Sequence, residues 1–128
     1  FGHGGEDGFA KERFLDIPQI KGFRNENALP LFITVTCEFS RFDNPLRNSA
    51  GEFVFWNKYG GAASMISTTR EVFISVGQGF NRNLMAVLWE FENEDLTIAE
   101  SLMKTKNEFS NFQKYLDSNF CEATNKLK

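Results

Sequence analysis

The sequence has little histidine and little cysteine. Its 128 residues include a single histidine, His3, and two cysteines, Cys37 and Cys121. One histidine excludes three-histidine zinc sites, Cys₂His₂ sites and the two-histidine helix of metalloproteases. Two cysteines cannot form the disulfide framework of a small secreted domain. Any chemistry that needs an imidazole therefore depends on His3 alone.

Positive charge and long apolar segments are also scarce. The chain has 14 basic and 17 acidic residues, a formal net charge of −3 at pH 7. This balance offers no basic patch for nucleic acid or for an anionic membrane surface. No apolar run approaches the roughly 20 residues of a membrane-spanning helix. We therefore expect a soluble globular chain with no nucleic-acid partner and no membrane-spanning segment.

Hydrophobic residues are sufficient for a core. They make up 41% of the chain, and phenylalanine occurs 15 times against two tryptophans and two tyrosines. Phenylalanine lacks the polar group that tyrosine and tryptophan present at binding surfaces, so this bias favours a structural role in the core. A chain of this length holds one domain at most.

Two segments have the composition of buried strands. The apolar, β-rich run over 28–36 is typical of a strand buried on both faces of a parallel sheet, and residues 62–67 predict a second such strand. Between these segments and before them, we expect a surface loop over 38–48 and a loop with one short helix over 9–27.

Helices are predicted from capping motifs and from apolar spacing. Capping boxes predict a short helix that begins at Ser49 and another that begins at Thr97 and ends near Phe109. Apolar residues at helical spacing predict a helix over 80–91, and residues 112–120 have a weaker helical pattern. Because strands and helices alternate, we expect an α/β fold whose sheet has covered faces.

His3 and Cys37 have the chemistry of a nucleophilic site. His3 lies among glycines, where the first residues indicate a strand that ends in a turn, and Cys37 directly follows the strand over 28–36. Ligands of parallel sheets bind beyond the carboxyl ends of the strands, so we expect both side chains in one crevice. A thiol with an ordinary pKa of about 8.5 is only a few per cent thiolate at neutral pH, and a neighbouring imidazole increases that fraction. The pair therefore predicts a nucleophile and a general acid.

Acyl transfer also needs donors for the developing oxyanion. The main-chain amides of Gly4 and Cys37 are the candidates, and losing one such donor typically costs about 3 kcal/mol of transition-state stabilisation. Glu6 and Glu38 are candidate supporting residues. Glu6 and Asp7 could orient His3, or they could be solvated turn residues. The sequence identifies no set of metal ligands.

Each of these features also has a structural interpretation. A lone cysteine at a strand end is often a small buried hydrophobic residue. The glycine turn around His3 could instead bind an anion, as in a flavodoxin-like regulatory domain. Arg41, Asp43 and Arg47 could line a substrate groove or belong to a solvated loop, and Cys121 is expected to be incidental.

Five segments carry a family resemblance. They are GHGGEDG at 2–8, LFITVTCEFSRFDNP at 31–45, SAGE at 49–52, GG at 60–61 and STTR at 67–70. Together they resemble the catalytic half of the gingipain-type cysteine peptidases, and most closely the PorU-type sortases of the type IX secretion system of Bacteroidetes. The resemblance extends over residues 1–108.

The resemblance implies a caspase-like α/β fold with a mostly parallel sheet and helices on both faces. It implies that His3 is the general acid/base, that Cys37 is the nucleophile, and that the amides of Gly4 and Cys37 form the oxyanion hole. It implies no cofactor; calcium is a candidate only by analogy with the family. Residues 1–128 would be the C-terminal portion of the peptidase domain, with an atypical or truncated tail over 109–128 and further strands upstream, so that the sheet is incomplete in this fragment.

The family's task defines the expected function. A sortase of this kind cleaves the C-terminal secretion signal of cargo proteins and passes the acyl-enzyme to an amine, at the cell surface or outer membrane of a Gram-negative bacterium. Its partners would be secreted proteins with that signal and other surface proteins of the secretion system. The alternatives are a gingipain-like protease that hydrolyses its substrates and a secretion-associated surface module with an idle site.

Overall fold

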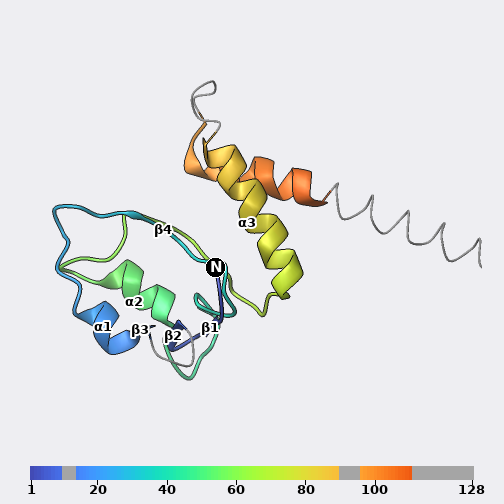
Figure 1. Ribbon diagram of the computed structural model, residues 1–128. Helices are drawn as coiled ribbons and strands as arrows, with labels where there is room; N and C mark the ends of the chain where they lie inside the picture. Colours follow the sequence, from blue (N-terminus) through green and yellow to red (C-terminus); the bar gives the residue numbers. More distant parts are fainter. Residues whose placement is uncertain (10–13, 90–95, 111–128) are drawn as a thin grey trace, which may run out of the picture. The chain divides into compact units, whose positions relative to one another are not determined.

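The computed structural model describes residues 1–9, 14–89 and 96–110 (Figure 1). The chain forms two compact units, Phe1–Gly77 and Gln78–Lys128. The helical pattern predicted over 112–120 lies outside the described residues, as does Cys121.

The first unit contains two small sheets. One is antiparallel, with the strand order β1 (Gly4–Gly5), β2 (Gly8–Phe9) and β3 (Leu15–Asp16). The other is parallel and consists of β4 (Leu31–Ile33) and β5 (Ser64–Ile66). The two strands expected over 28–36 and 62–67 are therefore confirmed as a parallel pair, although both are shorter than predicted. The expected burial on both faces is wrong for most of their residues, since Leu31 is exposed and only Ile66 is buried.

The expected mostly parallel sheet is wrong for the described residues, where only β4 and β5 are parallel. The reason lies in the first residues. Glu6 and Asp7 form a tight turn, and a two-residue connection can only join antiparallel strands. At the end of this turn Gly8 has a φ of 137°, a conformation that glycine adopts without strain.

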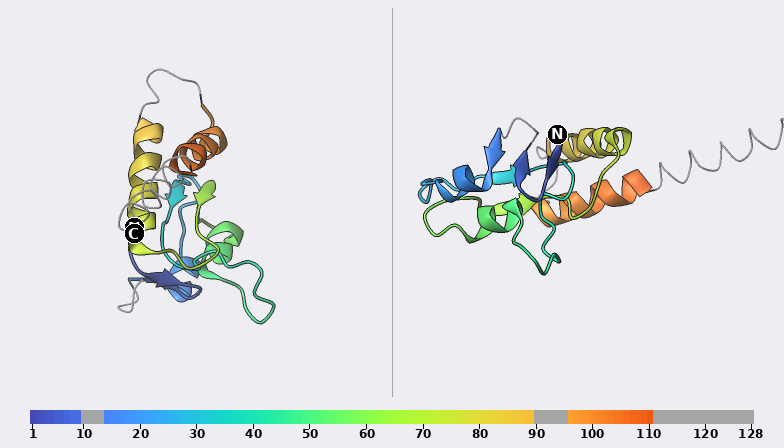
Figure 2. Two further views of the ribbon diagram at one scale, coloured as in Figure 1. Left: turned by 90° about the vertical axis from the view of Figure 1, so that its right-hand side faces the viewer. Right: turned by 90° about the horizontal axis from the view of Figure 1, so that it is seen from below.

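Two short helices complete the first unit. α1 (Ile17–Lys21) is capped by Asp16, whose carboxylate accepts a 3.0 Å hydrogen bond from the Gln19 amide. α2 (Ala50–Trp56) begins directly after Ser49, as predicted, and the Glu52 carboxylate accepts from the Ser49 amide at 2.7 Å. The short helix expected within 9–27 is thus confirmed as α1, and the residues from 38 to 48 form the expected loop, which projects from this unit in both views of Figure 2.

The core of this unit lies between α1, α2 and the sheets. Ile20, Phe39 and Val54 are fully buried in it, and the rings of Phe9 and Phe32 stack on Phe39 at centroid distances of 4.6 and 5.7 Å. The structural role expected for phenylalanine is correct for these three rings. It is wrong for the five phenylalanines that are more than half exposed, Phe1, Phe14, Phe42, Phe55 and Phe73.

The second unit contains most of α3 (Ile74–Trp89) and a helix over 98–110. α3 begins before the predicted residue 80. The second helix begins after Thr97, as predicted, with a capping box in which the Glu100 carboxylate accepts from the Thr97 amide at 2.8 Å. The rings of Phe80 and Phe109 meet edge to face with centroids 6.1 Å apart. Among the described residues, no helix is long and apolar enough to cross a membrane.

Candidate active site

Cys37 lies where the chain leaves β4 and runs beside the segment that follows β5. Main-chain hydrogen bonds join the two segments. The amides of Thr34, Glu38 and Ser40 donate to the carbonyls of Ile66, Arg70 and Thr68, at 2.9, 3.2 and 2.9 Å respectively. In addition, the Thr68 hydroxyl donates a hydrogen bond to the carbonyl of Thr36. The STTR segment at 67–70 therefore braces the chain on both sides of Cys37.

The Cys37 side chain is half-buried against Val72. The Val72 amide lies 3.5 Å from the Cys37 Sγ, to which it donates, and the thiol can donate to the Val72 carbonyl at 3.8 Å. The thiol is thus in contact with main-chain atoms of a residue that lies two positions after the bracing segment. The sequence could not predict this role of Val72, because any residue can supply a main-chain amide and carbonyl.

The backbone at Cys37 has two features of a reactive site. No hydrogen bond joins the Cys37 amide to any of the residues that the structure describes. The next residue, Glu38, has a φ of 50°, in the left-handed region that residues other than glycine seldom adopt. Such strain concentrates where the surrounding structure fixes a functional geometry.

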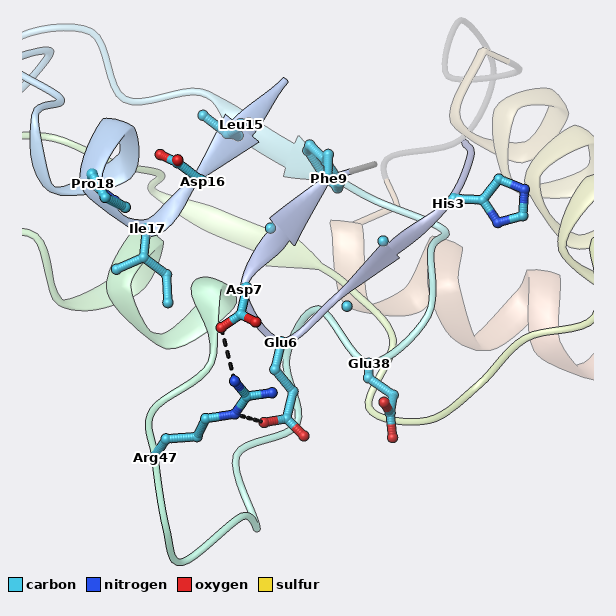
Figure 3. A pocket seen from close by; sticks show the side chains of 13 residues that line it. His3, Glu6, Asp7, Phe9, Leu15, Asp16, Ile17, Pro18, Glu38 and Arg47 are labelled. Atoms are coloured by element: carbon cyan, nitrogen blue, oxygen red, sulfur yellow. Dashed lines mark hydrogen bonds and ion pairs between the residues drawn. The ribbon is translucent and has the colours of Figure 1, made fainter. Parts of the chain in front are cut away.

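His3 precedes β1 and is exposed. The parallel strand expected to end at His3 is not found among the described residues, where β1 begins after His3 and pairs antiparallel with β2 in the other sheet. Its imidazole forms no hydrogen bond with the described residues, and Figure 3 shows it turned away from Glu6 and Asp7.

The structure nevertheless brings the two reactive segments together, by a different route. A Cβ atom added at Gly4 would lie 2.8 Å from both Cβ and Oγ1 of Thr36. Gly4 follows His3 and Thr36 precedes Cys37, so the residues next to the histidine and the cysteine are in direct contact. Only glycine permits this approach, because the Thr36 side chain is short and is held by a 3.0 Å hydrogen bond to Thr34.

Glu6 is nearly buried, with 5% of its surface exposed. Its carboxylate accepts hydrogen bonds from Arg47 Nε at 2.6 Å, from Asn44 Nδ2 at 2.8 Å and from Arg41 Nη1 at 3.2 Å. Burial alone would raise the pKa of Glu6, but the hydrogen bonds from Arg47 and Asn44 and the charges of Arg47 and Arg41 hold this pKa below its ordinary value. Glu6 therefore faces the loop over 38–48, and it is neither a freely solvated turn residue nor a partner of His3.

The charged residues of this loop are engaged in ion pairs. Arg41 Nη1 lies 2.8 Å from Glu38 Oε1, and Arg47 Nη1 lies 2.9 Å from Asp7 Oδ1. Asp43 receives two hydrogen bonds from Arg70, at 3.0 and 2.5 Å, and these hold the pKa of Asp43 below its ordinary value.

Arg41, Asp43 and Arg47 were expected to line a substrate groove or to belong to a solvated loop. Neither interpretation describes them fully, because these side chains fix the loop to the hairpin and to the bracing segment. Sequence reasoning missed this role, since the partners lie far away along the chain.

An open hollow of about 1060 Å³ lies beside the β1–β2 hairpin (Figure 3). Four of the predicted site residues line it: His3, Gly4, Glu6 and Glu38. Cys37 is not among the described residues that line it. The residues that the structure describes contain no group of three His, Cys, Asp or Glu side chains placed to hold a metal ion, so no step is assigned to calcium.

Comparison with known proteins gives one finding. The family model for Peptidase family C25 matches residues 1–126, a range that contains both His3 and Cys37. Neither the curated proteins nor the solved structures contain a match to this chain.

Proposed function

The chain belongs to peptidase family C25, and on this premise we propose that it is a cysteine endopeptidase in which Cys37 is the nucleophile and His3 the general acid/base. Family membership makes it a cysteine peptidase; the assignment of the two residues is the proposal. The observation that supports the assignment is the contact between Gly4, which follows His3, and Thr36, which precedes Cys37.

The proposed reaction follows from these groups. His3 accepts the proton of the Cys37 thiol, and the thiolate attacks the carbonyl carbon of the scissile peptide. The amides of Gly4 and Cys37 donate to the oxyanion as it forms. The C–N bond then breaks, and the imidazolium of His3 gives its proton to the leaving amine. An acyl group remains on Cys37 as a thioester.

The thioester has two fates, and we propose the second for this protein. Attack by water gives a free carboxylate, as in a gingipain-like protease. Attack by an amine gives a new amide, as in a sortase. The similarity of the segments at 2–8 and 31–45 to the PorU-type sortases supports transfer. The substrates would then be secreted proteins with a C-terminal signal, met at the cell surface of a Gram-negative bacterium together with other surface proteins of the secretion system.

Substitution of the reactive pair tests the proposal. Cys37→Ala and His3→Ala should each abolish cleavage of a peptide substrate, because no other histidine can replace His3 and the acyl group cannot form without the Cys37 thiol. Cys121→Ala is the matched control and should keep full activity. A thiol-reactive peptide probe should label Cys37 and spare Cys121.

Mass spectrometry of the cleaved product distinguishes the two acceptors, since added amine becomes part of the product only if transfer occurs. Retained cleavage in Cys37→Ala or in His3→Ala would contradict the proposal. Equal, slow labelling of both cysteines would instead favour a surface module with an idle site.

A further inference from the structure

We propose that Glu6, acting through Arg41, is a positioning residue that holds the hairpin carrying His3 against the segment carrying Cys37. The inference rests on the proposed peptidase function and deepens it. Glu6 lies on the turn that follows β1 and does not contact His3, so its role would be exerted on the two chain segments and not on the reacting atoms.

One guanidinium joins the two segments. Arg41 Nη1 lies 3.2 Å from Glu6 Oε1 and 2.8 Å from Glu38 Oε1. Glu6 belongs to the hairpin that begins just after His3, and Glu38 is bonded directly to Cys37. Hydrogen bonds between an arginine and a carboxylate are charge-assisted and strongly directional, so this bridge fixes the distance between the two segments.

Glu6 is also held from other directions. Its second carboxylate oxygen accepts from Arg47 and Asn44, and its main-chain carbonyl accepts a 2.7 Å hydrogen bond from the amide of Ala50 at the start of α2. The turn is therefore tied both to the loop over 38–48 and to a helix of the core. These contacts make Glu6 a rigid anchor point for the bridge.

Arg41 depends on its two carboxylates. Its Nε is buried and has no hydrogen-bond partner among the described residues, so the guanidinium is satisfied on one side only. Without the charge of Glu6, Arg41 would keep the full ion pair with Glu38 alone, and the charged bridge from the hairpin to the residue after Cys37 would be weakened. A displacement of about 1 Å in a reacting group can reduce a rate by about 100-fold.

The test compares two substitutions of the same kind, Glu6→Gln and Glu100→Gln, in a Cys121→Ala background. Glu100 is a matched control because its carboxylate also accepts two hydrogen bonds, both from Thr97, in the other unit. We expect kcat of Glu6→Gln to fall by about 10- to 100-fold with KM changed by less than about threefold, because the bridge aligns the reacting groups without binding substrate. Glu100→Gln should stay within about twofold.

A double variant tests whether Glu6 acts through Arg41. If both belong to one bridge, Glu6→Gln combined with Arg41→Met should lose little more than the larger single loss. If Glu6→Gln does not fold, Arg41→Met tests the same link, because methionine keeps an unbranched stem but has no donor for either carboxylate. Its kcat should fall in the same way. Additive losses in the double variant would overturn the proposal, as would an unchanged kcat in Glu6→Gln or, where that variant does not fold, in Arg41→Met.

A second readout does not require activity. The chain has one histidine, so the imidazole of His3 gives a single set of NMR signals. Alkylation of Cys37 by iodoacetamide should shift these signals in the Cys121→Ala protein and leave them unchanged in Glu6→Gln. If alkylation shifts the His3 signals in the Cys121→Ala protein but not in Glu6→Gln, and no peptide is cleaved, the bridge stands and the proposed function fails. If cleavage persists and Glu6→Gln matches Glu100→Gln in kcat, the bridge fails and the function stands. If alkylation does not shift the His3 signals in the Cys121→Ala protein and no peptide is cleaved, the bridge and the proposed function are both overturned.

Discussion

Single residues decide the local geometry of the candidate site. Glu38 holds a φ of 50° directly after Cys37, with its amide bonded to Arg70 and its carboxylate to Arg41. These two contacts keep a residue other than glycine in the left-handed region. Glu6 also fixes the local geometry, because its nearly buried carboxylate needs the three hydrogen-bond donors that surround it.

The lowered pKa of Glu6 predicts a pH dependence of stability. The pKa of Glu6 is below its ordinary value of 4.5 in the folded protein, so the folded state binds this proton less readily than the unfolded state. The stabilisation is therefore complete above the ordinary pKa and is lost as the pH falls through the lowered value. In urea titrations from about pH 7 to about pH 3, the difference in unfolding free energy between wild type and Glu6→Gln should be constant at first and should shrink in acid. A difference that does not change with pH would contradict this.

At the scale of elements, the site depends on how closely β1 approaches the chain after β4. β1 has only two residues, both glycine, and its place is fixed by pairing with β2 and by contact with Thr36. A strand this short has little pairing energy of its own, so its position depends on the absence of side chains at its contact with Thr36.

Gly4→Ala should displace β1. The added Cβ would lie 2.8 Å from Thr36 Cβ, a separation that neither residue can relieve by rotating a side chain. We expect a loss of about 1–3 kcal/mol in unfolding free energy, as for other overpacked sites, together with a loss of peptidase activity. Gly5→Ala is the matched control for stability, because nothing lies within 4 Å of a Cβ at that position. Urea denaturation of both variants measures the difference, and equal stabilities would show that β1 moves freely.

At the scale of the whole molecule, the chain divides into two units, each with its own buried residues. The first encloses Ile20, Phe39 and Val54, and the second encloses Leu84 and Thr105. All five predicted site residues belong to the first unit. The geometry at Cys37 therefore depends on the core around Phe39, from which the chain runs back to Glu38 and Cys37.

Phe39→Ala should unfold this core. The side chain is fully buried and stacks on Phe9 and Phe32, so its removal leaves a cavity and costs about 3–5 kcal/mol. Phe55→Ala is the control, since Phe55 is 61% exposed and its loss should change stability little. Thermal unfolding followed by circular dichroism compares the two variants. A Phe39→Ala protein as stable as Phe55→Ala would show that this ring cluster does not support the site.

The sequence by itself determined where two of the helices begin and to which family the chain belongs. Capping boxes at Ser49 and Thr97 set where two helices begin, because a cap is satisfied by residues within one turn. The family could be inferred from the short segments around His3 and Cys37, since the chemistry of a thiol and an imidazole belongs to the residues themselves.

Only the tertiary structure decided how the segments around His3 and Cys37 approach each other. The antiparallel hairpin that follows His3 was not predicted, and neither was the close approach of Gly4 to Thr36. The bridge from Glu6 through Arg41 to Glu38 was also decided there, because its partners are distant in the chain and their distances depend on the folded core. Local pattern fixes local hydrogen bonds, whereas contacts between distant residues follow from the packing that brings them together.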